Sequence, residues 1–97
     1  MPTYITFGKF TQSGIENIKE GPSRLDEAKK AFQSMGAEIK DFYLVTGEYD
    51  MVLVIEAPDD ETVAKLALII GSKGTSRTVT MRAFDEDAYR KMISELF

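Results

Sequence analysis

The chain has neither cysteine nor histidine. Without cysteine it has no disulfide framework, no thiolate metal site and no cysteine nucleophile. Without histidine, the Ser-His-Asp and Cys-His catalytic systems, imidazole-based zinc sites and the usual proximal haem ligand are excluded. Acid–base chemistry would fall to Asp, Glu, Tyr or Lys. The sequence accordingly predicts no metal site and no cofactor.

Long apolar runs and a basic surface are also missing. No segment approaches the ~20 apolar residues needed to cross a bilayer, and the first ten residues, MPTYITFGKF, do not read as an export signal. The net charge of −4 argues against nucleic-acid binding, because neutralising phosphates needs a basic face. We therefore expect a cytoplasmic protein that binds neither membranes nor nucleic acids.

What is present is enough apolar sequence for one globular domain over residues 1–97, with 43% hydrophobic and 29% charged residues. Alternating apolar residues predict strands, and apolar residues three or four apart predict helices. A short helical turn is expected after the first strand. The other elements, in chain order, are strand 4–10, helix 22–35, strands 37–46 and 49–57, a helix from 59 that ends at Gly71–Gly74, strand 75–84 and helix 85–97.

This β-α-β-β-α-β order predicts an α+β fold, with a four-stranded antiparallel sheet backed by two helices. The arrangement is the ferredoxin-like plan, and its first and third strands are central. The added C-terminal helix is amphipathic, since its apolar residues fall on one side: Tyr89, Met92, Ile93 and Leu96.

The third strand is apolar on both faces, with Val52 and Val54 on the face opposite Leu53. An antiparallel sheet with one face in water should alternate more cleanly. The simplest cover is the same sheet of a second copy, which would form a dimeric α+β barrel. The sequence therefore predicts a homo-oligomer, either a dimer or a multiple of dimers.

Asp50 stands at the start of this apolar strand, where a bare carboxylate would be costly to bury. One interpretation is structural: Asp50 accepts hydrogen bonds from backbone amides of the Thr46–Glu48 turn or a neighbouring strand end. The other is functional: a carboxylate at a cleft mouth, paired with Arg82, Arg77 or Arg24. Aspartate is common in turns, so the structural interpretation is preferred.

Tyrosines and a polar patch supply the other candidates. Tyr43 and Tyr49 could offer phenolic hydroxyls, although a strand tyrosine usually packs and reaches water. As a strand residue, Tyr49 is expected on the same face as Met51 and Leu53. If the first and fourth strands pair, polar side chains gather on one face of the sheet: Tyr4, Thr6, Thr78, Thr80 and Arg82. This patch is either a binding site or a polar interface.

Two further cations stand in unusual places. Arg24 begins the main helix, where the helix dipole disfavours a cation. Either an ion pair with Asp26, Glu27 or Asp50 or simple exposure to solvent would explain it. Arg77 closes the stretch GSKGTSR, which has the composition of an anion-binding loop. That stretch follows a helix C-terminus and lacks a phosphate-loop context, so a capping loop is preferred.

These motifs resemble the GYD domain family, small bacterial and archaeal proteins named for a Gly-x-Tyr-Asp motif, here Gly47 to Asp50. The stretches YITFGKFTQSGIENIKEGPSR, FYLVTGEYDMVLVIEAPDDE and LALIIGSKGTSRTVTMRAF extend the similarity over nearly the whole chain. The resemblance implies a ferredoxin-like fold of the dimeric α+β barrel type and no known reaction. Its motif positions are Thr11, Gly14, Asn17, Arg24, Gly47, Tyr49, Asp50, Gly71, Gly74 and Arg77.

Three functions remain open from the sequence. The first is a homo-oligomer that binds a small ligand between sheet and helices. The second is a cofactor-free isomerase or monooxygenase in which Asp50 handles protons beside Tyr49. The third is an effector-sensing module. The predicted ligand-binding residues are Tyr4, Thr6, Thr11, Arg24, Tyr43, Tyr49, Asp50, Arg77, Thr80 and Arg82.

Overall fold

The computed structural model describes all 97 residues and contains every predicted strand and helix, with ends shifted by a residue or two. The elements are β1 (Thr3–Phe10), α1 (Gln12–Glu16), a 3-10 turn η1 (Ile18–Glu20), α2 (Gly21–Ser34), β2 (Glu38–Leu44), β3 (Met51–Glu56), α3 (Asp60–Ser72), β4 (Ser76–Ala83) and α4 (Glu86–Leu96). No helix is both long and apolar enough to cross a membrane.

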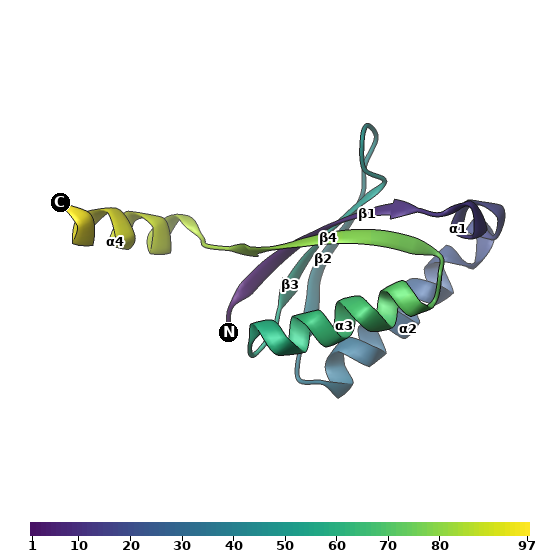
Figure 1. The fold of residues 1–97 in the computed structure, drawn as a ribbon, viewed down its shortest axis with the longest axis horizontal. Helices are drawn as coiled ribbons and strands as arrows, with labels where there is room; N and C mark the ends of the chain where they lie inside the picture. The colour runs from purple at the N-terminus through teal and green to yellow at the C-terminus, as the bar shows by residue number, and fades with distance from the viewer.

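The four strands form one antiparallel sheet in the order β2-β3-β1-β4. Helices α2 and α3 both lie on one side of it (Figure 1). The ferredoxin-like α+β fold is thus confirmed, and β1 and β3 are the central strands as predicted.

The register of the central strands decides which side chains face the helices. Tyr4 lies opposite Ile55, and Thr6 lies opposite Leu53. Because successive side chains of a strand point to opposite faces, these residues share the face that α2 and α3 cover. Tyr4, Leu53 and Ile55 belong to the hydrophobic core, which is completed by Phe32, Ala37, Ile39, Ala57, Val63 and Leu66. Thr6 is also buried.

The opposite face of the sheet carries no helix, and we call it the open face. Register places Ile5 opposite Val54 and Phe7 opposite Val52 on it. β4 adds Val79 and Met81, whose side chains are each 49% exposed. The prediction that the third strand is apolar on both faces is therefore confirmed.

Local signals in the sequence account for the helix ends. The Asp59 carboxylate accepts the Thr62 backbone N–H at 2.8 Å and so caps α3. That hydrogen bond, with a second from the Thr62 hydroxyl, lowers the pKa of Asp59. Gly36 follows α2 with a φ of 75°, the left-handed conformation that glycine adopts most readily.

Helix α4 leaves the rest of the molecule. It projects past the end of the sheet beyond β4 (Figure 1), and none of its residues is buried. The chain is elongated as a result, with extents of 52 × 31 × 18 Å and a radius of gyration of 14.7 Å. A compact domain of this length would have a radius of gyration of about 12.5 Å.

Candidate functional site

The helix-covered side of the sheet holds a cavity of about 620 Å³ between α2, α3 and the strands. Its walls are mostly apolar, which is typical of sites for small organic ligands of this size. The apolar lining comes from both helices and from β2 and β3; it includes Leu25, Ala28, Phe32, Phe42, Met51, Leu53, Leu66, Ala67 and Ile70.

Hydroxyl groups provide the polar part of the cavity floor. The Thr6 and Thr80 hydroxyls lie 2.8 Å apart and hydrogen-bond to each other across β1 and β4. Thr78 and Ser76 continue this hydroxyl row along β4. Since each hydroxyl can both donate and accept, the row could offer hydrogen bonds to a ligand without changing charge.

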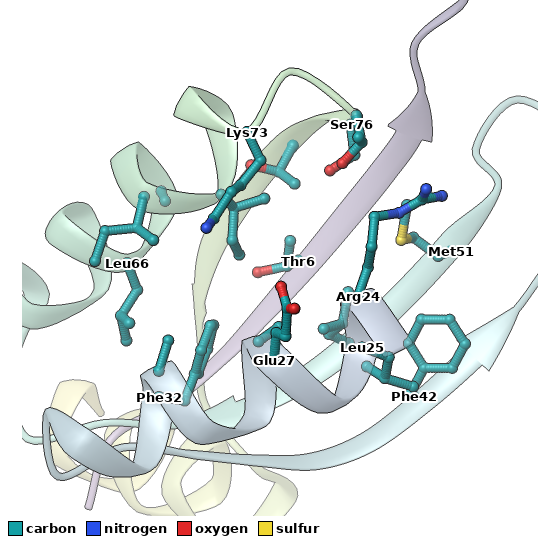
Figure 2. Close-up of a pocket in the computed structure, with 18 of the residues that line it drawn as sticks. Thr6, Arg24, Leu25, Glu27, Phe32, Phe42, Met51, Leu66, Lys73 and Ser76 are labelled. Carbon is teal, nitrogen blue, oxygen red and sulfur yellow. The ribbon is translucent and has the colours of Figure 1, made fainter. Parts of the chain in front are cut away.

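Charged side chains stand around the opening of the cavity. Figure 2 shows Arg24 and Glu27 extending from α2 and Lys73 from the end of α3, with Thr6 behind them on β1. Neither Glu27 nor Lys73 takes part in an ion pair. An apolar interior with charges of both signs at its mouth suits a ligand with an apolar body and a polar end.

Arg24 also has a structural task that the sequence did not predict. Its guanidinium donates to the backbone oxygens of Asn17, at 2.9 Å, and Gly14, at 3.2 Å. These carbonyls end the short helix α1, where a cation is favoured. The expected ion pair with Asp26, Glu27 or Asp50 is not formed.

Thr11 belongs to the same corner of the fold and not to the cavity lining. Its hydroxyl accepts the Gly14 backbone N–H at 3.2 Å and donates to the Gly74 carbonyl at 2.6 Å. The Thr11 backbone N–H donates to Thr75 at 3.1 Å. Motif positions from two distant parts of the chain therefore meet here to hold α1 against the loop before β4.

Asp50 is engaged by the backbone, as the structural interpretation predicted. Its carboxylate accepts the Phe10 backbone N–H at 2.9 Å, and its own N–H donates to Gly8 at 2.9 Å. The Asp50 carbonyl accepts from Val45 at 2.8 Å, which closes the turn between β2 and β3. Asp50 forms no ion pair with an arginine and does not line the cavity.

Tyr49 lies on a different side of the sheet from the one expected. The strand pattern placed it with Met51 and Leu53, but β3 begins only at Met51. The Tyr49 ring instead contacts Phe7, with centroids 5.1 Å apart, and Lys9, whose Nζ is 5.4 Å from the ring centroid. Tyr43, 57% exposed, also lies outside the cavity lining.

Tyr4 and Arg82 form a second polar cluster at the other end of the sheet. The buried Tyr4 hydroxyl donates to the Asp60 carboxylate at 2.5 Å. Burial, helped by that hydrogen bond, raises the pKa of the Tyr4 phenol. The Arg82 guanidinium lies over the rings of Tyr4, at 5.6 Å, and Phe84, at 4.4 Å.

The ten predicted binding residues are thus divided among several places. Thr6, Arg24 and Thr80 line the cavity. Thr11 and Arg77 line a shallower hollow beside the end of α3. The others, Tyr4, Tyr43, Tyr49, Asp50 and Arg82, lie outside both. No three acidic side chains gather closely enough to hold a metal ion.

Sequence reasoning missed most of the cavity wall because its residues have the pattern of a packed core. Phe42, Met51 and Ile70 look like ordinary strand and helix interior positions. The available signal was the small side chains on the helix faces, Ala28 and Ala67, which leave room where larger residues would close the space.

Fold and cavity together define a small α+β module with a ferredoxin-like sheet and a ligand-sized space under its helices. The model of the GYD domain matches residues 4–93, and this chain belongs to the GYD domain family.

Comparisons with individual proteins agree with this assignment. A Thermus thermophilus protein named glutamine synthetase and cystathionine beta-lyase binding protein is 36% identical over 84 residues, covering 86% of this chain and 88% of the relative. A solved structure of a protein from Thermus thermophilus matches 88% of this chain and 95% of its own, with a TM-score of 0.54 and 23% identity.

A larger protein shares the same fold. The feast or famine regulatory protein from M. tuberculosis, solved in complex with L-methionine, has a TM-score of 0.66 and 15% identity. The match covers 88% of this chain but 51% of the regulator, so this chain spans about half of that protein. At such identities, both structural similarities show the fold alone.

Proposed function

We propose that this protein is a homo-oligomeric binding module that takes a small, largely apolar molecule into the cavity between the sheet and helices α2 and α3. The cavity itself carries the proposal: at about 620 Å³ it falls within the range of small-molecule sites. The Thr6–Thr80 pair would orient the ligand, and the mixed charges at the mouth, from Arg24, Glu27 and Lys73, favour a ligand with a polar end.

The test compares two substitutions on helix α3, one that fills the cavity with a large side chain and one that does not. Ala67 lines the cavity, whereas Ala64 on the same helix is exposed and does not. The probe is anilinonaphthalene sulfonate, an aromatic body with an anionic group. We expect Ala67→Phe to weaken its binding by at least about tenfold, and Ala64→Phe to leave it unchanged. Equal binding by both variants, with native circular dichroism, would overturn the cavity proposal.

A second candidate function is supported by the relative from Thermus thermophilus, whose name describes it as binding two metabolic enzymes. We propose that this chain also binds an enzyme of amino-acid metabolism. The test mixes it with purified glutamine synthetase and with purified cystathionine beta-lyase from its own host. Co-elution in size-exclusion chromatography is expected for at least one of them, and separate elution of both would refute this function.

A further inference from the structure

Helix α4 has an apolar side that nothing in its own chain covers. Tyr89, Met92, Ile93 and Leu96 recur three or four residues apart and are between 39% and 68% exposed. Other parts of α4 are well formed: Asp85 accepts the Ala88 N–H at 2.8 Å, and Arg90 pairs with Glu86 at 2.8 Å. The helix therefore has an N-cap and an ion pair on its polar side, but its apolar side has no packing partner.

A helix of this length needs such a surface. α4 has 11 residues, and isolated helices shorter than ~12–15 residues are marginal in water. Its projection beyond the sheet leaves it no neighbour in its own copy (Figure 1). A partner must supply the contact that stabilises it.

The surface area of the whole chain indicates that this partner is large. The chain exposes 6754 Å², whereas a compact monomer of 10.9 kDa would expose about 5,600 Å². The excess is more than about 1,000 Å², and a stable protein interface buries about 800 Å² on each partner. The excess is thus of the size that one protein interface removes.

A second copy of this chain fits the position of the uncovered surfaces. The open face and α4 follow one another along the chain, since β4 carries Val79 and Met81 on that face and then leads through Phe84 into α4. A copy stacked on the open face would lie beside the projecting helix. The two-fold relation of such a pair would give each copy the arm of the other.

We infer that α4 is an exchanged arm: the apolar side formed by Tyr89, Met92, Ile93 and Leu96 packs on the second copy of the homodimer, not on its own. This inference rests on the proposed homodimer. It adds that the C-terminal helix contributes to the dimer and is ordered by it.

Mixed-label NMR of the full chain tests where α4 packs. One set of copies carries labelled methionine and isoleucine methyls, and the other carries only labelled backbone amides. We expect nuclear Overhauser effects from the Met92 and Ile93 methyls to amides of the other copy. Contacts seen only within one copy, or a frayed α4 without contacts, would overturn the exchanged arm.

A pair of variants with the same charge change measures how much the arm contributes. Ile93→Glu places a carboxylate on the apolar side, and Ser94→Glu places one on the polar side of the same turn. We expect Ile93→Glu to raise the dimer dissociation constant at least about tenfold and Ser94→Glu to change it little. If wild type is a dimer and neither substitution changes its dissociation constant, the exchanged arm is refuted while the dimer is retained. If wild type is a monomer, the dimer itself is refuted.

Discussion

Asp50 shows how one polar residue can begin an apolar strand without cost to the core. Its carboxylate accepts a hydrogen bond from the Phe10 N–H of the neighbouring strand. Its backbone N–H donates to Gly8, and its carbonyl accepts from Val45. A buried or half-buried carboxylate that is hydrogen-bonded in this way stabilises the fold. Asp50, the last residue of the family motif, is therefore explained by the geometry of the strand ends before any chemistry is assigned to it.

The protonation of Tyr4 is tied to folding. Its phenol donates to Asp60, and its pKa is raised in the folded chain. Below its ordinary pKa of about 10 both states keep the proton. Above about 10 the unfolded chain ionises first, so the stabilisation is lost as pH rises through the folded pKa.

We therefore expect the free energy of unfolding of wild type to be about 0.5–1.5 kcal/mol larger than that of Tyr4→Phe near neutral pH. This difference in stability should become smaller above about pH 10. Urea denaturation at a fixed protein concentration measures it. The other tyrosines are present in both proteins, so their titration cancels. A difference that stays constant or widens with pH would contradict this account of Tyr4.

At the scale of elements, the corner at α1 is tightly packed. Gly14 is buried there, and a Cβ atom on it would lie 2.1 Å from the Thr75 backbone oxygen. That oxygen already accepts the Thr11 N–H, so it is held in place. Gly71, in the last turn of α3, has open space around it.

These two glycines predict opposite effects of the same substitution. Gly14→Ala should destabilise the fold by at least about 2 kcal/mol, because the backbone must move to admit one methyl group. Gly71→Ala should stabilise it by about 0.5–1 kcal/mol, because alanine loses less conformational freedom in a helix. Thermal unfolding of both variants beside wild type gives the comparison. Equal effects would show that the α1 corner is looser than its contacts indicate.

At the scale of the whole molecule, the apolar surface exceeds what one chain can bury. The open face presents Ile5, Phe7, Val52 and Val54 from the two central strands. α4 adds a separate apolar side beyond the sheet. An uncovered face of this kind usually marks an interface.

A charge on the open face should therefore separate the copies without unfolding them. Val54→Glu points away from the core, and in a face-to-face dimer two added carboxylates would be buried together. We expect the dimer dissociation constant to rise about 100-fold or more, measured by analytical ultracentrifugation. Thr46→Glu, in the exposed turn, is the control with the same charge change. Unchanged association of Val54→Glu would exclude this face as the interface.

The sequence by itself determined the order of elements and the two faces of β3, and it favoured a structural task for Asp50. Those features depend on local periodicity and turn chemistry, which act over a few residues and can be read from the chain. Strand pairing between β1 and β4 also followed, because few topologies suit this order of elements.

Only the tertiary structure decided where the candidate site lies. The cavity depends on how far α2 and α3 stand apart over the sheet, and on small residues such as Ala28 and Ala67 that meet only after folding. Arg24 bonds to carbonyls seven and ten residues away, and Thr11 bonds to Gly74 across the chain. Such contacts join positions that no local pattern connects, because packing in three dimensions creates them.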